Sequence, residues 1–351
     1  MTGPFDHPFL GGLFGDQDAA HIWAPERQIT HMLAFEAAYT RALGRVGKVD
    51  AETAEKIAQR IETFVPDMSA LCSGTASDGV VIPALVAQLK AAIDSDPANI
   101  HKGTTSQDVI DTALALTLRD FDDLLDRKLD ALSNEFGRLA EQFGERRLMG
   151  RTRMQAAMPI ALVERLTVWA QPLEQHQKRL TRLRPTVERL QLGGAAGDRA
   201  ALAPHADEIA SSMADQLGLQ NPGLVWHAIR DDIADYANLL SLITGSLGKF
   251  GQDICLMAQQ GIDEVTLAGG GGSSAMPHKQ NPILAELLVT LARFNATQIG
   301  GMHHALVHEQ ERSGSAWALE WMILPQMAQA TARSLTAATE ICGKITSIGT
   351  A

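Results

Sequence analysis

The sequence predicts an all-α protein built as an elongated bundle of long helices. Two segments without internal proline, 98–158 and 223–276, carry apolar residues at three- and four-residue steps. Helices of about 25–30 residues, spanning about 40 Å, fit these segments. Strand signals are nearly absent, since the chain has two tyrosines, few β-branched runs and no Asn-Gly turn.

The first hundred residues predict shorter helices, for example over 26–43 and 51–64. A zone rich in Pro, Gly, Ser and Asp at 94–103 predicts a domain boundary. We therefore expect a small helical N-terminal domain over 1–100 and a long-helix bundle over 101–351. The long helices are apolar on more than one face, which favours a helical homo-oligomer.

Composition restricts the function classes. The 351 residues are 45% apolar, enough for a sizeable core, and the net charge of -11 argues against a nucleic-acid partner. No apolar run approaches the ~18 residues of a membrane span, and the N-terminus lacks the features of a signal peptide. Three scattered cysteines without a CxxC motif indicate a reducing compartment. We expect a cytoplasmic enzyme without a membrane partner.

The most informative segment is the glycine-rich stretch 269–282, Gly-Gly-Gly-Gly-Ser-Ser-Ala-Met-Pro-His-Lys-Gln-Asn-Pro. Its glycines leave backbone N–H groups free to face an anion. Ser273 and Lys279 add a hydroxyl and a cation, a combination that suits carbanion chemistry beside a carboxylate. A flexible Gly/Ser linker would have no reason to keep the last seven residues in this order. We interpret the stretch as a catalytic loop.

Two other segments offer groups for an anion. Thr105, Ser106 and Gln107 stand at the start of the first long helix, where they could hold a carboxylate or only cap the helix. Arg151 and Arg153 precede a helical stretch expected from Pro159. They could clamp an anion or form surface ion pairs.

Two further motifs favour a plain structural reading. The run 193–197, Gly-Gly-Ala-Ala-Gly, lacks a preceding strand and a phosphate-binding lysine, so we expect a tight helix–helix turn. His304 and His308 are spaced one helical turn apart, which fits a polar helix face better than a metal site. We therefore predict no bound metal.

Together these segments resemble the fumarase/aspartase superfamily in order and spacing. The superfamily's Gly-Ser-Ser-x-Met-Pro-x-Lys-x-Asn-Pro loop is matched over 272–282, and its Thr-Ser-Gln/Asn-Asp segment over 105–108. The resemblance implies a cofactor-independent enzyme that acts on a small di- or tricarboxylate. It also implies a tetramer whose sites combine three chains. Superfamily members usually add a small C-terminal helical domain, whereas this chain stops at Ala351, so we expect a bundle without it.

A finer resemblance is to the 3-carboxy-cis,cis-muconate cycloisomerase family, which forms 4-carboxymuconolactone in protocatechuate (beta-ketoadipate) catabolism. Residues 226–231 are similar to its Trp-His-x-x-Arg-Asp segment, 193–197 to its glycine turn, and 311–325 to its Glu-Arg…Trp-x-x-Glu-Trp…Leu-Pro signature. Adenylosuccinate lyases differ at two places. They carry a histidine at the position of Arg153 and a phosphate-binding serine and arginine at the positions of Trp317 and Trp321.

Some alternatives stay open. Arg153 departs from the cycloisomerase pattern too, which often has tryptophan there, so another 3-substituted muconate such as 3-sulfomuconate remains a candidate substrate. A lyase that eliminates fumarate and a non-catalytic scaffold are the rival classes.

The resemblance also implies residue roles. Ser273 would be the acid/base, Lys279 would stabilise its charge, and Asn281 would orient a carboxylate. Glu286, in the following helix, would support them. The residues expected to bind substrate are Thr105, Ser106, Gln107, Arg151, Arg153, Gln155, His278 and Arg312.

Overall fold

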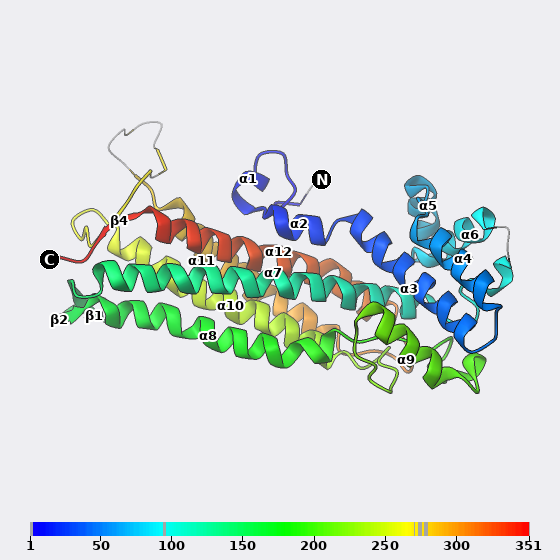
Figure 1. Cartoon of the computed structure of the whole chain (residues 1–351). Helices are drawn as coiled ribbons and strands as arrows, with labels where there is room; N and C mark the ends of the chain where they lie inside the picture. Colours follow the sequence, from blue (N-terminus) through cyan, green and yellow to red (C-terminus); the bar gives the residue numbers. More distant parts are fainter. Residues whose placement is uncertain (1–2, 94–95, 270, 273–275, 277–279, 351) are drawn as a thin grey trace.

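Long parallel and antiparallel helices dominate the computed structural model, which describes residues 3–93, 96–269, 271–272, 276 and 280–350. Five helices run side by side along the molecule (Figure 1). They are α7 (Ser106–Phe143), α8 (Leu162–Val187), α10 (Asp231–Met257), α11 (Ile283–His304) and α12 (Ser315–Lys344). The predicted all-α bundle is confirmed.

The other helices lie against the side of the bundle or at one end of it (Figure 1). In chain order they are α1 (Gly11–Phe14), α2 (Gln17–Ile22), α3 (Pro25–Arg45), α4 (Ala51–Glu62), α5 (Met68–Asp78), α6 (Ile82–Ala92), the 3₁₀ turns η1 (Pro97–Asn99) and η2 (Ala200–Leu202), and α9 (Ala206–Leu217). Helices α3 and α4 occupy the two ranges expected from the sequence.

The apolar stripes of the long helices form the core. On α7, the apolar residues at three- and four-residue steps from Leu118 to Leu139 are buried, and on α10 those from Ile233 to Met257 are buried. A second core joins α3, α4, α6 and α9 to the first turns of α7. The two cores meet on α7 between Leu116 and Leu118. The domain division at residue 100 stays a prediction.

Two short two-stranded sheets correct the sequence analysis. Strands β1 (Arg147–Thr152) and β2 (Gln155–Ala161) pair antiparallel, and β3 (Val265–Leu267) pairs with β4 (Ile345–Ile348). The helix expected from Pro159 is wrong there, because Pro159 lies in β2 and α8 begins at Leu162. The turn residues Arg153 and Met154 have φ of 48° and 67°. That left-handed backbone is usually signalled by Asn-Gly, so the hairpin was missed.

Two other local predictions are corrected. The 193–197 run lies within the long connection from α8 to α9 and is not a tight helix–helix turn. His304 is the last residue of α11, so His308 lies beyond the helix and shares no face with it. Within the described ranges, no cluster of three or more His, Cys, Asp or Glu residues could hold a metal ion. No described helix is long and apolar enough to cross a membrane.

A buried carboxyl group on α7 makes fold stability depend on pH. Asp122 is fully buried and accepts a hydrogen bond from the Tyr236 hydroxyl. Its other oxygen has no partner among the described residues. Burial raises the pKa of Asp122 well above its usual range, Glu188 adds to the rise, and Arg184 opposes it. The folded chain therefore binds a proton that the unfolded chain releases as pH rises above about 4.

We expect Asp122→Asn to stabilise the fold by about 1–2 kcal/mol at pH 8 and by less at pH 5. The amide keeps an acceptor for Tyr236 and removes the cost of retaining the proton. Urea unfolding at both pH values measures the change. Asp126→Asn is the matched control, since Asp126 is exposed on the same helix. An Asp122→Asn variant whose stability keeps the wild-type dependence on pH would contradict the assignment.

Candidate active site

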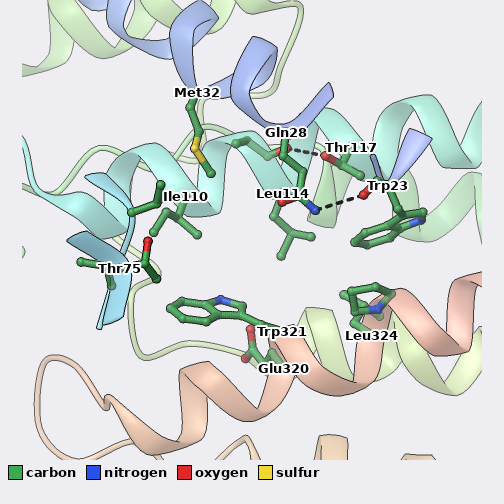
Figure 2. Close-up of a pocket in the computed structure, with 14 residues that line it drawn as sticks. Trp23, Gln28, Met32, Thr75, Ile110, Leu114, Thr117, Glu320, Trp321 and Leu324 are labelled. Carbon is green, nitrogen blue, oxygen red and sulfur yellow. Dashed lines mark hydrogen bonds between the residues drawn. The ribbon is translucent and has the colours of Figure 1, made fainter. Parts of the chain in front are cut away.

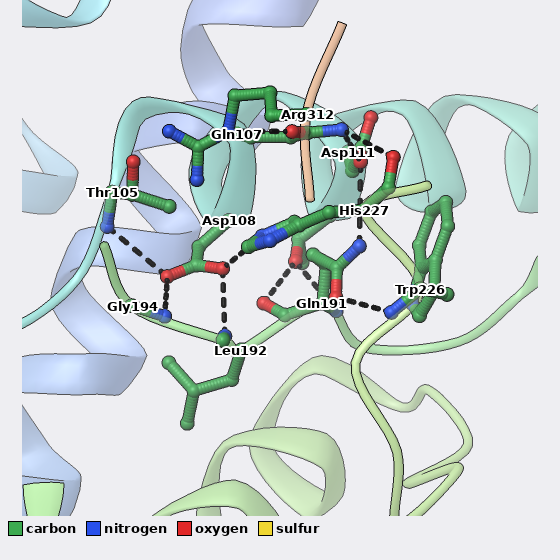
Figure 3. Close-up of polar contacts among 12 residues, drawn as sticks. Thr105, Gln107, Asp108, Asp111, Gln191, Leu192, Gly194, Trp226, His227 and Arg312 are labelled. Atoms are coloured by element: carbon green, nitrogen blue, oxygen red, sulfur yellow. Dashed lines mark hydrogen bonds and ion pairs between the residues drawn. The ribbon is translucent and has the colours of Figure 1, made fainter. Parts of the chain in front are cut away.

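The N-terminus of α7 rests on the glycine-rich connection from α8. Thr105 precedes the helix in extended backbone and donates its N–H to Asp108 Oδ2 at 3.0 Å. The buried Asp108 carboxylate also accepts the N–H groups of Gly193 and Gly194 at 2.7 and 2.9 Å. His227 Nε2 lies 2.8 Å from Asp108 Oδ1 (Figure 3). These glycine N–H groups thus serve an internal carboxylate.

The neighbours of Gly193 leave no room for a side chain. A Cβ atom there would lie 2.5 Å from Val225 Cγ1 and 2.7 Å from His227 Cε1. The close approach lets the backbone reach Asp108, which explains the glycine in physical terms. The 193–197 segment therefore anchors the start of α7 through Asp108.

Gln107 and Arg312 meet beside this anchor (Figure 3). Gln107 Oε1 accepts a hydrogen bond from Arg312 Nε at 2.9 Å, and Arg312 Nη2 donates to the Ala195 carbonyl at 3.2 Å. The two residues are 205 positions apart in the chain. The structure thus brings together Thr105, Gln107 and Arg312 of the predicted site, with Ser106 as the first residue of α7.

A buried ion network supports the same region. Arg230 Nη1 donates to Asp111 Oδ2 at 2.8 Å, and Arg230 Nε donates to Glu320 Oε1 at 2.9 Å. Trp317 Nε1 donates to Asp111 Oδ1 at 3.1 Å. Burial raises the pKa of Glu320, and the neighbouring Arg230 opposes that rise. Arg230, Asp111 and Glu320 are each at most 2% exposed, so the pair of carboxylates depends on the arginine.

Sequence reasoning missed this network. Arg230 and Glu320 were part of the motifs at 226–231 and 311–325, but no role was predicted for them. Asp111 lies in the first long apolar segment, and no role was predicted for it either. A carboxylate at a buried position of such a stripe requires a partner, so Asp111 was the available signal. The spacing could not indicate which cation supplies it.

An apolar cavity of about 270 Å³ lies next to the network, between α3, α7 and α12 (Figure 2). Trp23, Met32, Ile110 and Trp321 form much of its wall. Trp321 is held edge to face against Trp317, with ring centres 4.6 Å apart. Glu320 also lines the cavity. This wall suits the hydrocarbon part of a ligand and offers no phosphate clamp.

Three other predicted binding residues, Arg151, Arg153 and Gln155, lie on the β1–β2 hairpin at the opposite end of the bundle (Figure 1). Arg151 is on β1 and donates to Glu264 Oε1 at 2.6 Å. Arg153 is exposed in the hairpin turn, and Gln155 is exposed at the start of β2. Helix α7 has 38 residues and therefore separates the two ends by about 57 Å.

Gly271 and Asn281, which flank the predicted catalytic loop, also lie at this second end. Asn281 forms two backbone hydrogen bonds with Gly271, each 3.0 Å long. Glu286 is exposed in the first turn of α11, and its charge adds to the effect of burial in raising the pKa of Cys255 to about 11. Ser273, His278 and Lys279 lie outside the described residues. The predicted site residues that the structure describes thus form two groups in one chain.

Comparisons with known proteins agree with this architecture. A family described as lyase matches residues 7–299. A 3-carboxy-cis,cis-muconate cycloisomerase of Pseudomonas aeruginosa is 37% identical over 87% of this chain and 68% of the relative. An N-acetyl-S-(2-succino)cysteine lyase of Enterococcus italicus is 30% identical over 92% of this chain and 71% of the relative.

The solved structures include a 3-carboxy-cis,cis-muconate lactonizing enzyme from Pseudomonas putida. Its TM-score is 0.89 at 34% identity, covering 97% of this chain and 77% of that one. The family match spans most of the sequence, and the fold agrees over nearly its whole length. The chain therefore belongs to the lyase family of the fumarase/aspartase superfamily and, within it, groups with the 3-carboxy-cis,cis-muconate cycloisomerases.

Proposed function

We propose that this chain is a cofactor-independent cycloisomerase that converts 3-carboxy-cis,cis-muconate to 4-carboxymuconolactone in protocatechuate catabolism. The similarity to cycloisomerases from Pseudomonas and Acinetobacter supports this substrate. The observation that carries it is Arg312, a cation held by the neutral oxygens of Gln107 and Ala195, in the same region as a cavity walled by Trp321. Such a site suits a compact polycarboxylate with a planar diene.

The reaction requires charge stabilisation and one proton. A substrate carboxylate adds to the conjugated diene, a C–O bond forms, and a five-membered lactone closes. The electron pair moves to the far carboxylate as an aci-carboxylate, and the adjacent carbon then accepts a proton. We assign that proton to Ser273, with Lys279 and the glycine-loop N–H groups stabilising the charge.

The remaining assignments divide the substrate carboxylates among the site residues. Asn281 and His278 would orient the reacting end, with Glu286 behind them. Thr105, Ser106 and Arg312 would hold another carboxylate. Arg151, Arg153 and Gln155 would face the 3-substituent. The attacking carboxylate is already ionised near neutral pH, so this reaction needs no second acid.

This scheme requires more than one chain. Arg312 contacts Gln107 at the start of α7, whereas Gly271 and Asn281, which flank the loop, lie beyond the other end of that helix, so we expect that one copy cannot supply both groups to one substrate. Exposed apolar side chains along the long helices offer contact surfaces for other copies. Examples are Val168 on α8 at 53%, Leu242 on α10 at 41% and Met322 on α12 at 66% exposure. We propose a homotetramer with composite sites.

Mixing two inactive variants tests the composite site. Ser273→Ala and Arg312→Ala, dissociated together and reassembled at equal ratio, are expected to regain about one quarter of the wild-type rate. A site is intact when an Arg312→Ala chain supplies its Ser273 and a Ser273→Ala chain supplies its Arg312. Ser273→Ala mixed with Lys279→Ala is the control, because one chain supplies both residues and no recovery is expected. Hybrids verified by mass spectrometry that stay inactive would contradict the arrangement.

One assay tests the activity itself. The protein is mixed with 3-carboxy-cis,cis-muconate without added metal, and loss of the diene ultraviolet absorbance is followed. Lactone formation supports the proposal. An unchanged diene, with fumarate released instead from an N-acetyl-S-(2-succino)cysteine substrate, would favour the eliminating lyases that also resemble this chain. Turnover of 3-sulfomuconate in preference to the tricarboxylate would reassign the 3-substituent.

The state of the cysteines bears on the compartment in which the protein acts. Cys72, Cys255 and Cys342 are all free thiols. Thiols persist where the surroundings are reducing. We propose that the enzyme acts in the cytoplasm.

A further inference from the structure

Gln107 is fully buried, and internal partners occupy its amide. Its Nε2 donates to Asp111 Oδ2 at 3.1 Å and to the His227 carbonyl at 2.9 Å. Its Oε1 accepts from Arg312 Nε at 2.9 Å. Both amide hydrogens are therefore committed to protein acceptors, which leaves no donor for a ligand.

The neighbours of the amide determine its orientation. Two acceptors, the Asp111 carboxylate and the His227 carbonyl, face one side, so the NH₂ group must point there and the oxygen toward Arg312. The acceptors are themselves held, Asp111 by Arg230 and the His227 ring by Asp108. A reversed amide would place its oxygen against a carboxylate. Gln107 Oε1, which accepts the hydrogen bond from Arg312, is thus held in a fixed position.

Arg312 differs from the buried Arg230 in its partners. It donates to two neutral oxygens, Gln107 Oε1 and the Ala195 carbonyl. None of the carboxylates that the structure describes forms an ion pair with it. Neutral acceptors fix the direction of a guanidinium without cancelling its charge, so the charge remains available to an anion.

We propose that Gln107 is a positioning residue that aims Arg312 at a substrate carboxylate and does not itself touch the substrate. This departs from the direct binding role expected from the sequence. It rests on the proposed function for the identity of the substrate, but the anchoring of a polycarboxylate can be measured separately. The chain Arg230–Asp111–Gln107–Arg312 connects a buried ion network to a half-exposed cation.

A double-mutant cycle tests the proposal on the intact oligomer. Propane-1,2,3-tricarboxylate, an inert triacid, is titrated by calorimetry, and KM and kcat are measured with 3-carboxy-cis,cis-muconate. Gln107→Met is expected to raise Kd and KM by about 10-fold with kcat changed less than about 3-fold. Arg312→Ala should raise Kd by about 10²-fold. The double variant should bind no more weakly than Arg312→Ala alone.

Gln191→Met is the matched control. Gln191 is also fully buried, donates to the same Asp111 oxygen at 3.4 Å and accepts the Trp226 N–H, but the hydrogen bonds of Arg312 go to Gln107 and Ala195 instead. We expect its KM and Kd to stay within about 3-fold of wild type. Equal losses of melting temperature in both variants, with unchanged KM in both, would show a purely structural role and overturn the proposal.

Gln107→Glu provides a second variant of the same size. Its carboxylate would repel Asp111 and neutralise Arg312, so it should weaken triacid binding more than Gln107→Met does. Additive losses in the double variant would show that Gln107 contacts the ligand directly, against the proposal. Wild-type protein that binds the triacid but leaves the diene unchanged would refute the cycloisomerase assignment, and the binding cycle would still decide the role of Gln107.

Discussion

Replacing Ser273 by alanine is expected to lower kcat by at least ~10² while the fold stays intact. The hydroxyl would supply the proton that the aci-carboxylate carbon accepts, and alanine has no proton to give. KM should change little, because the substrate carboxylates bind elsewhere. Steady-state kinetics on the diene absorbance, with circular dichroism for the fold, measure both effects.

Ser274→Ala is the control for this substitution. It removes a hydroxyl from the same loop, one residue away. We expect it to retain most of the wild-type kcat. An undiminished rate in Ser273→Ala would remove Ser273 from the proton transfer, and a collapse in Ser274→Ala alone would move that role to the neighbouring hydroxyl.

The second large effect concerns stability. Arg230→Met is expected to destabilise the fold by about 3–5 kcal/mol, since it leaves Asp111 and Glu320 buried without their cation. Trp226, whose ring lies 5.0 Å from the Arg230 guanidinium carbon, loses a stacking partner as well. Urea unfolding followed by tryptophan fluorescence measures the loss.

Arg182→Met is the contrasting variant. Arg182 and Asp235 form a 3.1 Å ion pair whose side chains are 66% and 44% exposed, so its loss should cost less than about 1 kcal/mol. Adding Glu320→Gln to Arg230→Met should recover part of the stability by removing one uncompensated charge. Similar losses in Arg230→Met and Arg182→Met would contradict the importance of the buried network.

The long helices could be predicted because their signal is local. A stripe of apolar residues at helical spacing forms the buried face of α7 or α10 whatever the neighbours are. The hairpin at 147–161 could not be found in this way. Its turn uses Arg153 and Met154 at positive φ, and pairing with β2 stabilises a backbone that neither residue prefers.

The candidate site was predictable only in part. Motif order selected Thr105, Gln107 and Arg312, yet their spacing gives no reason why residues 205 positions apart should meet. A buried arginine also looks like a surface charge in a sequence, so Arg230 and its carboxylates had no role until the fold placed them together. The role of the glycine run 193–197 likewise became clear only from the contacts of Gly193 and Gly194 with Asp108.

The length of α7 has a consequence for evolution under this scheme. Inserting one helical turn into α7 would keep its apolar stripe on the same face of the helix. In the proposed assembly, the same insertion would shift the hairpin that follows α7 in one copy by about 5.4 Å relative to Arg312 of another. In this scheme, the length of α7 sets the distance between binding groups that different copies supply. Functional relatives should vary freely in the sequence of α7's exposed face but tolerate almost no change in its residue count.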